Sequence, residues 1–224
     1  MIININQTQA DRDQLFDVFY DNMPKYRGKL GRFSPLETFS LRSKIQKLNL
    51  TGAYALPSPL DMVPFTYIFG RPKIIRNCYC QINMRRLGTI GCVEEGIAKI
   101  HHHITDSSGT KFDAYHFAEY NGSEYICIYL EDDLQVAMIE SSLTVENSCK
   151  RYTLYILDEY KDRADIFSMF VMYFDNWYNA TRFRAKNGTT TAQKKPTKVY
   201  TDKFDPNWHV VNFRDEVFND SDAR

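Results

Sequence analysis

The pattern of apolar and polar residues divides the chain into one folded domain, residues 1–182, and a polar C-terminal arm, residues 183–224. Within the domain, residues 1–49 show helical spacing, residues 50–160 alternate as strands do, and residues 162–180 carry the most continuous apolar stripe. We therefore predict an α+β fold: a mainly antiparallel sheet flanked by N-terminal helices and one strongly apolar C-terminal helix, with an extended C-terminal arm.

Two helices are predicted in the first zone, after a short apolar strand at residues 2–5. Leu15, Phe19 and Met23 lie four residues apart and would share one face of a helix. Residues 34–37 read Ser-Pro-Leu-Glu, a serine cap followed by proline at the first helical position and glutamate at the third, which is a typical helix start.

Strands are predicted throughout the second zone because Tyr, Ile, Phe and Val often alternate there with polar residues. Asn121–Gly122 favours a two-residue hairpin turn, and residues 106–109 favour a second hairpin loop, so residues 97–130 should form a three-stranded antiparallel meander. The predicted strands are residues 52–56, 63–69, 73–82, 97–105, 112–120, 124–130, 135–145 and 152–160.

The helix expected at residues 162–180 is apolar around most of its circumference. Its stripe consists of Ile166, Met169, Phe170, Tyr173, Phe174, Trp177 and Tyr178, widened by Phe167 and Val171. Such a helix must be covered on nearly every side, by the sheet of its own domain or, alternatively, in part by another subunit.

The arm has almost nothing of its own to bury, and its charge changes from basic to acidic near Phe204. A polar segment of this kind becomes ordered when it packs on another surface, and we predict that this surface is a neighbouring subunit. The predicted interface residues are the apolar anchors Trp208, Val210, Val211 and Phe213, and the basic residues Arg182, Arg184, Lys194 and Lys195, which would meet an acidic surface.

The composition narrows the class of protein without selecting a function. Lys+Arg and Asp+Glu balance at 28 each, so no overall charge attracts nucleic acid or anionic lipid, whereas 15 Tyr and 15 Phe make the chain unusually aromatic. Residues 1–7 lack the pattern of a signal peptide, and no uninterrupted apolar run approaches the length of a membrane span. Five cysteines without Cys-x-x-Cys spacing are typical of reduced thiols, so we expect a protein that is neither secreted nor membrane-bound.

A metal site is the first candidate for chemistry. On a strand, His101 and His103 would share one face, and Asp113 or His116 on the next strand would supply a third ligand. Two histidines that simply face solvent are the favoured interpretation, so we predict no bound metal.

An acyltransferase site is the second candidate. Residues 85–91 resemble the Arg/Gln-x-x-Gly-x-Gly pyrophosphate loop of GNAT acetyltransferases and precede a possible helix at residues 92–99, although their glycines are one residue too far apart. The carboxylate pairs Asp132–Asp133 and Asp158–Glu159 stand where predicted strands end, as charged turns do. We therefore predict that the protein is not an enzyme and binds no cofactor, with a GNAT-like acyltransferase as a second alternative.

Nucleic-acid binding is the first alternative function, because a Tyr- and Phe-rich sheet beside a Lys- and Arg-rich arm can stack bases and hold phosphates. It would make the protein a phage-encoded binder of single-stranded RNA or DNA.

Two segments are similar to tail-terminator proteins of contractile-tailed bacteriophages. Residues 63–67, Val-Pro-Phe-Thr-Tyr, resemble a Val-Pro-x-Thr-Tyr strand of that family, and residues 152–157 followed by 165–177 resemble its aromatic strand and helix. No strand pair is evident after the helix, where the family continues its sheet. The resemblance implies a ring-forming α/β subunit that caps the tail and has no active site. We therefore predict a structural virion protein of the tail or neck, found in the virion or host cytoplasm, that contacts copies of itself and other virion subunits.

Overall fold

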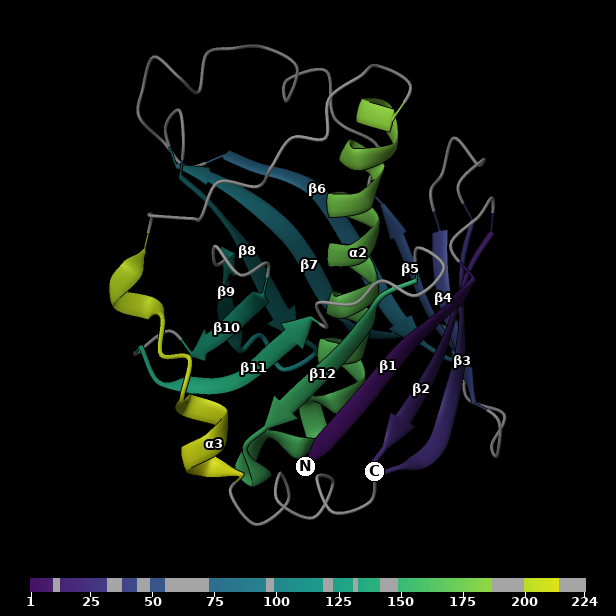
Figure 1. Ribbon diagram of the computed structural model, residues 1–224. Coiled ribbons are helices and arrows are strands. Elements are labelled where there is room, and N and C mark those ends of the chain that lie inside the picture. Colours follow the sequence, from purple (N-terminus) through teal and green to yellow (C-terminus); the bar gives the residue numbers. More distant parts are fainter. Residues whose placement is uncertain are drawn as a thin grey trace.

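A barrel of strands surrounds a long helix in the computed structural model of the chain (Figure 1). The helix α2 (Ala164–Lys186) follows the last strand and runs along the inside of the barrel. The structure describes residues 1–9, 13–31, 38–43, 49–54, 73–95, 99–118, 123–130, 133–141, 149–186 and 200–213.

Twelve strands form the barrel, and each pairs antiparallel with the next along the chain. The strands are β1 (Ile2–Gln9), β2 (Asp13–Tyr20), β3 (Met23–Gly31), β4 (Thr38–Ser43), β5 (Asn49–Tyr54), β6 (Lys73–Ile82), β7 (Arg85–Glu95), β8 (Lys99–Asp106), β9 (Lys111–Ala118), β10 (Glu124–Leu130), β11 (Gln135–Ser141) and β12 (Arg151–Ile156). The barrel closes where β1 pairs with β12, with Ile3 opposite Leu154 and Ile5 opposite Tyr152. All four of these side chains belong to the interior core.

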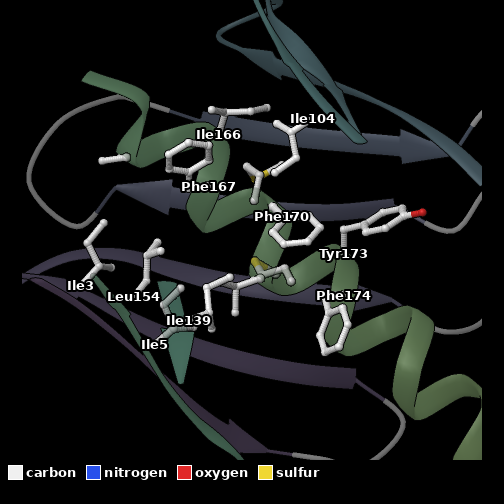
Figure 2. Packing of buried hydrophobic residues seen from close by; sticks show 14 of the residues in the cluster. Ile3, Ile5, Ile104, Ile139, Leu154, Ile166, Phe167, Phe170, Tyr173 and Phe174 are labelled. Atoms are coloured by element: carbon white, nitrogen blue, oxygen red, sulfur yellow. The ribbon is translucent and has the colours of Figure 1, made fainter. Parts of the chain in front are cut away.

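The described side chains of helix α2 from Ile166 to Asn176 are buried on every side of the helix because they lie in the lumen. Residues 166–175, almost three turns, are each at most 1% exposed. Figure 2 shows Phe167, Phe170 and Phe174 on the helix among inward-pointing strand side chains such as Ile104 and Ile139. Barrels of about eight strands can be filled by their own side chains, whereas wider ones enclose space, so a helix about 10–12 Å across fills this lumen.

Hydrogen bonds fix the helix along the barrel axis at two levels. Near its start, the hydroxyls of Tyr20 and Tyr26 donate to Asp165 Oδ1 over 2.7 and 2.9 Å. Burial and the adjacent Asp165 carboxylate raise the pKa of both tyrosines well above the usual range, so both remain donors. Further along, the Tyr152 hydroxyl of β12 donates to the fully buried Asp175.

A buried ion pair lies in the wall of the same barrel. Lys150 Nζ is 3.4 Å from Glu124 Oε2, and both side chains are almost completely buried. His116 Nε2 lies 4.0 Å from the same carboxylate oxygen, and its ring packs 5.0 Å from that of Phe174. Buried charges of this kind are tolerated only when each has a partner, so this cluster constrains how β10 and β12 pack around the helix.

The predicted α+β fold is wrong, because the sheet is a closed barrel and the described residues of the zone predicted to hold N-terminal helices form strands β1 to β4. In β2, Phe16 and Val18 point into the core, and Leu15 and Phe19 lie on the opposite face. With apolar residues on both faces, the four-residue spacing of a helix and the two-residue spacing of a strand are both present.

The turn between β2 and β3 also explains residues that seemed to end a helix. Asp21 and Asn22 adopt left-handed backbone conformations, with φ of 46° and 63°, as a two-residue hairpin turn requires. Met23 is 68% exposed, and Pro24 follows at a shift in strand register, where a missing backbone donor is tolerated. Within the predicted start of the second helix, residues 34–37 lie outside the described residues.

The sequence was more informative in the later zones. Strands β6 and β10 have the predicted bounds, strands β8 to β10 form the predicted meander, and residues 106–109 form its first hairpin loop. The predicted helix at residues 162–180 is confirmed as the 3-10 helix η3 (Asp158–Arg163) followed by α2. The helix predicted at residues 92–99 is wrong, because β7 extends through Glu95. Two predicted features, the strand 63–69 and the Asn121–Gly122 turn, lie outside the described residues.

Among the residues that the structure describes, no helix combines the length and apolarity needed to cross a membrane.

The hydrogen bond between Tyr152 and Asp175 can be tested by removing its donor. Tyr152→Phe keeps the ring and leaves a buried carboxylate oxygen without this hydrogen bond, so we expect a loss of about 1–3 kcal/mol in the free energy of unfolding, measured by urea denaturation. The matched control is Tyr79→Phe on β6, whose side chain is 55% exposed and which should change stability by less than about 0.5 kcal/mol. Equal effects of the two substitutions would contradict a special role for Tyr152.

Candidate interaction surface

One side of the barrel carries apolar side chains on its outer face as well as its inner face. In β10, Ile126 and Ile128 point into the lumen, so Tyr125, Cys127 and Tyr129 point outward. We call this outer surface the aromatic face; it consists of His101, Tyr115, Phe117, Tyr125, Cys127, Tyr129, Met138 and Tyr155. Aromatic side chains gathered in this way are stable only when something covers them.

Residues 200–213, which we call the C-terminal segment, cover the aromatic face. They contain the 3-10 helix η4 (Thr201–Lys203) and the short helix α3 (Trp208–Asn212), both drawn in yellow on the outside of the barrel in Figure 1. The Phe204 ring stacks on that of Phe117, with centroids 4.8 Å apart, and lies 5.4 Å from that of Tyr125. Each such pair contributes about 0.5–1.5 kcal/mol beyond its buried area.

The two ends of the C-terminal segment also rest on aromatic rings. At its start, the Tyr200 ring lies 4.8 Å from that of Tyr115 and 6.1 Å from that of His101. At its end, the Phe213 ring lies 5.4 Å from that of Tyr155. The segment therefore spans the outer surface of strands β8 to β12.

Polar contacts add to this cover without extending the sheet. The Tyr129 hydroxyl is 3.0 Å from the backbone oxygen of Lys203 and 3.1 Å from Gln135 Oε1, and its one proton can be donated to either. The Lys203 ammonium pairs with Asp133. The backbone-to-backbone hydrogen bonds described for the segment run within the segment itself, as expected beside a closed barrel that has no free strand edge.

Cys127 lies beneath the C-terminal segment, so the reactivity of its thiol depends on whether the segment covers it. Its side chain is fully buried, and burial raises the pKa of its thiol to about 12. The backbone amide and the carboxylate of Asp205 both influence this pKa, so Asp205 of the C-terminal segment lies close to the thiol. A thiol held in this state is protonated and inert to alkylating reagents at neutral pH.

The predicted interface residues fall into three groups in the structure. Trp208 and Phe213 pack with each other, 5.9 Å between ring centroids, and toward the chain's own barrel. Val210 is 37% exposed and Val211 74%, so both point away from it. Arg182 and Arg184 lie on α2, but their side chains are outside the described part of the chain, as are Lys194 and Lys195 entirely. Docking of these residues on a neighbour stays a prediction.

The histidines of β8 divide between the two faces as the alternation predicted. His103 Nδ1 is 3.0 Å from Asp113 Oδ1, and His101 Nε2 is 3.7 Å from the same oxygen. His116, the other predicted third ligand, faces the lumen instead. Among the described side chains, no group of three metal-binding residues is found.

The third histidine of β8, His102, points into the lumen. Its ring packs against those of Phe170, Tyr173 and Phe174, with centroids 5.5–5.8 Å apart. Burial, with a smaller contribution from His101, lowers the pKa of His102 to about 3, so it is neutral at physiological pH. The ring therefore acts as part of the core.

The other candidate motifs do not form a site within the described residues. Residues 85–91 lie inside strand β7 rather than at a helix N-terminus, so their backbone does not present the amide cradle of a pyrophosphate loop. Asp158 and Glu159 begin η3, and Asp133 pairs with Lys203; Asp132 lies outside the described residues.

The aromatic face itself was missed at the level of sequence, although a signal for it exists. Residues 125–130 of β10 form an unbroken apolar run, Tyr-Ile-Cys-Ile-Tyr-Leu. A strand with one solvated face alternates, whereas a continuous run indicates that both faces are covered. The C-terminal segment covers this outer face, whereas from the sequence we predicted that the segment packs on a neighbouring subunit.

The packing of Phe204 can be tested through the reactivity of Cys127. Phe204→Ala removes two ring contacts, so we expect the segment to open more often and the Cys127 peptide to be alkylated about tenfold faster, as measured by mass spectrometry. Val211→Ala, in the same segment but mostly exposed, should leave this rate unchanged. Equal rates in the two variants would show that Phe204 does not hold the segment over the thiol.

Comparison of the chain with protein-family models, with curated proteins and with solved structures finds no match.

Proposed function

We propose that the protein is a structural subunit of an oligomeric assembly, in which the C-terminal segment joins neighbouring subunits. The observation that carries this proposal is the contact between that segment and the aromatic face. It is an interface between two separable surfaces, built from stacked rings such as Phe204 on Phe117. The chain thus contains both halves of a protein–protein contact of the kind that aromatic residues dominate.

The distribution of side chains supports a function exercised on the outside of the barrel. The inward-facing residues of the barrel are packed against α2, which occupies the lumen. On the outside, α3 turns Trp208 toward the barrel while Val210 and Val211 remain exposed. A short helix with one face docked and apolar side chains on the other is suited to lie between two subunits.

A bacteriophage tail or neck remains the assembly that we propose, on the strength of the sequence resemblance alone. The order of an aromatic strand and a helix, β12 and α2, is as the resemblance implies. The α/β ring subunit that it also implies differs from the closed barrel of this chain. We therefore propose a virion subunit of a different architecture.

Assembly can be tested by measuring mass in solution for the full chain and for a chain ending at Lys186, which retains the barrel strands and α2. We expect the full chain to form oligomers and the shortened chain to be a monomer with an unchanged far-ultraviolet circular dichroism spectrum of the barrel. A full chain that stays monomeric at all concentrations would overturn the proposal. A monomer that gains mass only with single-stranded RNA would favour the nucleic-acid alternative.

The exposed valines of α3 provide a point-mutation test. Replacing both Val210 and Val211 by Ser should weaken association at least about tenfold, because each loses part of the roughly 1.5–3 kcal/mol gained when a buried aliphatic side chain leaves water. Met84→Ser, on the β6–β7 turn and 90% exposed, is the control for loss of an exposed apolar side chain, and it should leave association unchanged. Equal weakening by both variants would remove α3 from the interface.

A further inference from the structure

The aromatic face and the C-terminal segment recognise each other through side chains. Tyr200, Phe204 and Phe213 each meet a different ring of the face, and Lys203 pairs with Asp133 beside it. This matched spacing makes the face a receptor for one particular stretch of sequence. Every copy of the chain carries both the receptor and that stretch.

The segment can leave the face without breaking the sheet. Its described backbone-to-backbone hydrogen bonds are internal, for example from Val211 N to Asn207 O, and it pairs with no strand of the closed barrel. The core inside the barrel is filled by α2 and does not include the segment. Release therefore costs only the ring contacts, the Lys203 contacts and the burial of the outer face, and it leaves the barrel intact.

The length of the connection between α2 and the C-terminal segment determines which copy's aromatic face the segment can reach. Residues 187–199 join Lys186 of α2 to Tyr200. A chain of this length spans up to about 45 Å when extended. Helix α2 begins beside Tyr20, Tyr26 and the β2–β3 turn, so it leaves the barrel at the opposite end (Figure 1). The length of this connection sets how far from that end the aromatic face of a neighbouring barrel must lie.

We propose that in the assembly residues 200–213 of one copy occupy the aromatic face of a second copy. This inference rests on the proposed function and names its partner and its receptor surface. The contacts are the same whether the segment lies on its own barrel or on the next one, so concentration and linker geometry decide between the two arrangements. If each copy places its segment on the next copy, the assembly closes into a ring or grows as a chain. If two copies place their segments on each other, the assembly is a dimer.

A disulfide trap distinguishes the two arrangements, because Asp205 of the C-terminal segment lies close to Cys127 of the aromatic face. Asp205→Cys places a second thiol beside Cys127. Isotopically labelled and unlabelled copies of this variant are mixed, assembled, oxidised and digested. Peptides linked between Cys127 and the introduced thiol are then examined by mass spectrometry. Only an interchain link can join a labelled peptide to an unlabelled one, whereas an intrachain link never does.

We expect links with mixed labels at concentrations where light scattering shows oligomers, and only unmixed links in dilute monomer. The variant Ser107→Cys places a thiol on the exposed β8–β9 hairpin and should form no link to Cys127. Adding Cys127→Ser to the Asp205→Cys variant should abolish the diagnostic peptide. Oligomers whose links are all unmixed, or that form no link at all, overturn the exchange and leave the proposed function standing. A chain that never oligomerises overturns both.

Discussion

The lumen of this barrel has to be filled, and most of the fold depends on how that is done. Twelve strands close into a barrel that is too wide for strand side chains to fill alone. Residues 166–174 of helix α2, which are apolar except for Ser168, supply the missing volume. Tyrosine hydroxyls of the barrel strands donate hydrogen bonds to Asp165 and Asp175 of the helix. These bonds fix the position of the helix along the barrel axis.

The same strands that enclose the helix also carry a second, outer layer. Strand β10 lies between α2 on the inside and Phe204 of the C-terminal segment on the outside, and this position accounts for its unbroken apolar sequence. The inner layer is integral to the barrel. The outer layer, the C-terminal segment, is held by contacts between aromatic rings, by the ion pair of Lys203 with Asp133 and by the hydroxyl of Tyr129, without strand pairing. A contact of this kind is separable from the fold, which is why the surface beneath it is the strongest candidate for interaction.

The three histidines of β8 illustrate how the face of the barrel on which a side chain lies determines its surroundings. His101 and His103 lie outside, near one aspartate, and His102 lies in the core with its pKa lowered to about 3. Three consecutive identical residues thus have different environments, as alternation along a strand requires. The buried pair Lys150–Glu124 likewise exists only because β10 and β12 both pair with β11, which brings Glu124 near Lys150 at the start of β12.

Local patterns by themselves determined the bounds of β6 and β10, the meander of β8 to β10, and the presence and apolar character of α2. These features depend on residues close in sequence. The tertiary structure decided the rest. Residues 13–20 form a strand, because pairing with β1 and β3 outweighs the helical spacing of Leu15, Phe19 and Met23. Closure between β1 and β12, and the placement of α2 inside rather than beneath a sheet, join residues from opposite ends of the folded domain. Such contacts leave no periodic trace in the chain, since periodicity records which residues face a common surface and not which surface covers them.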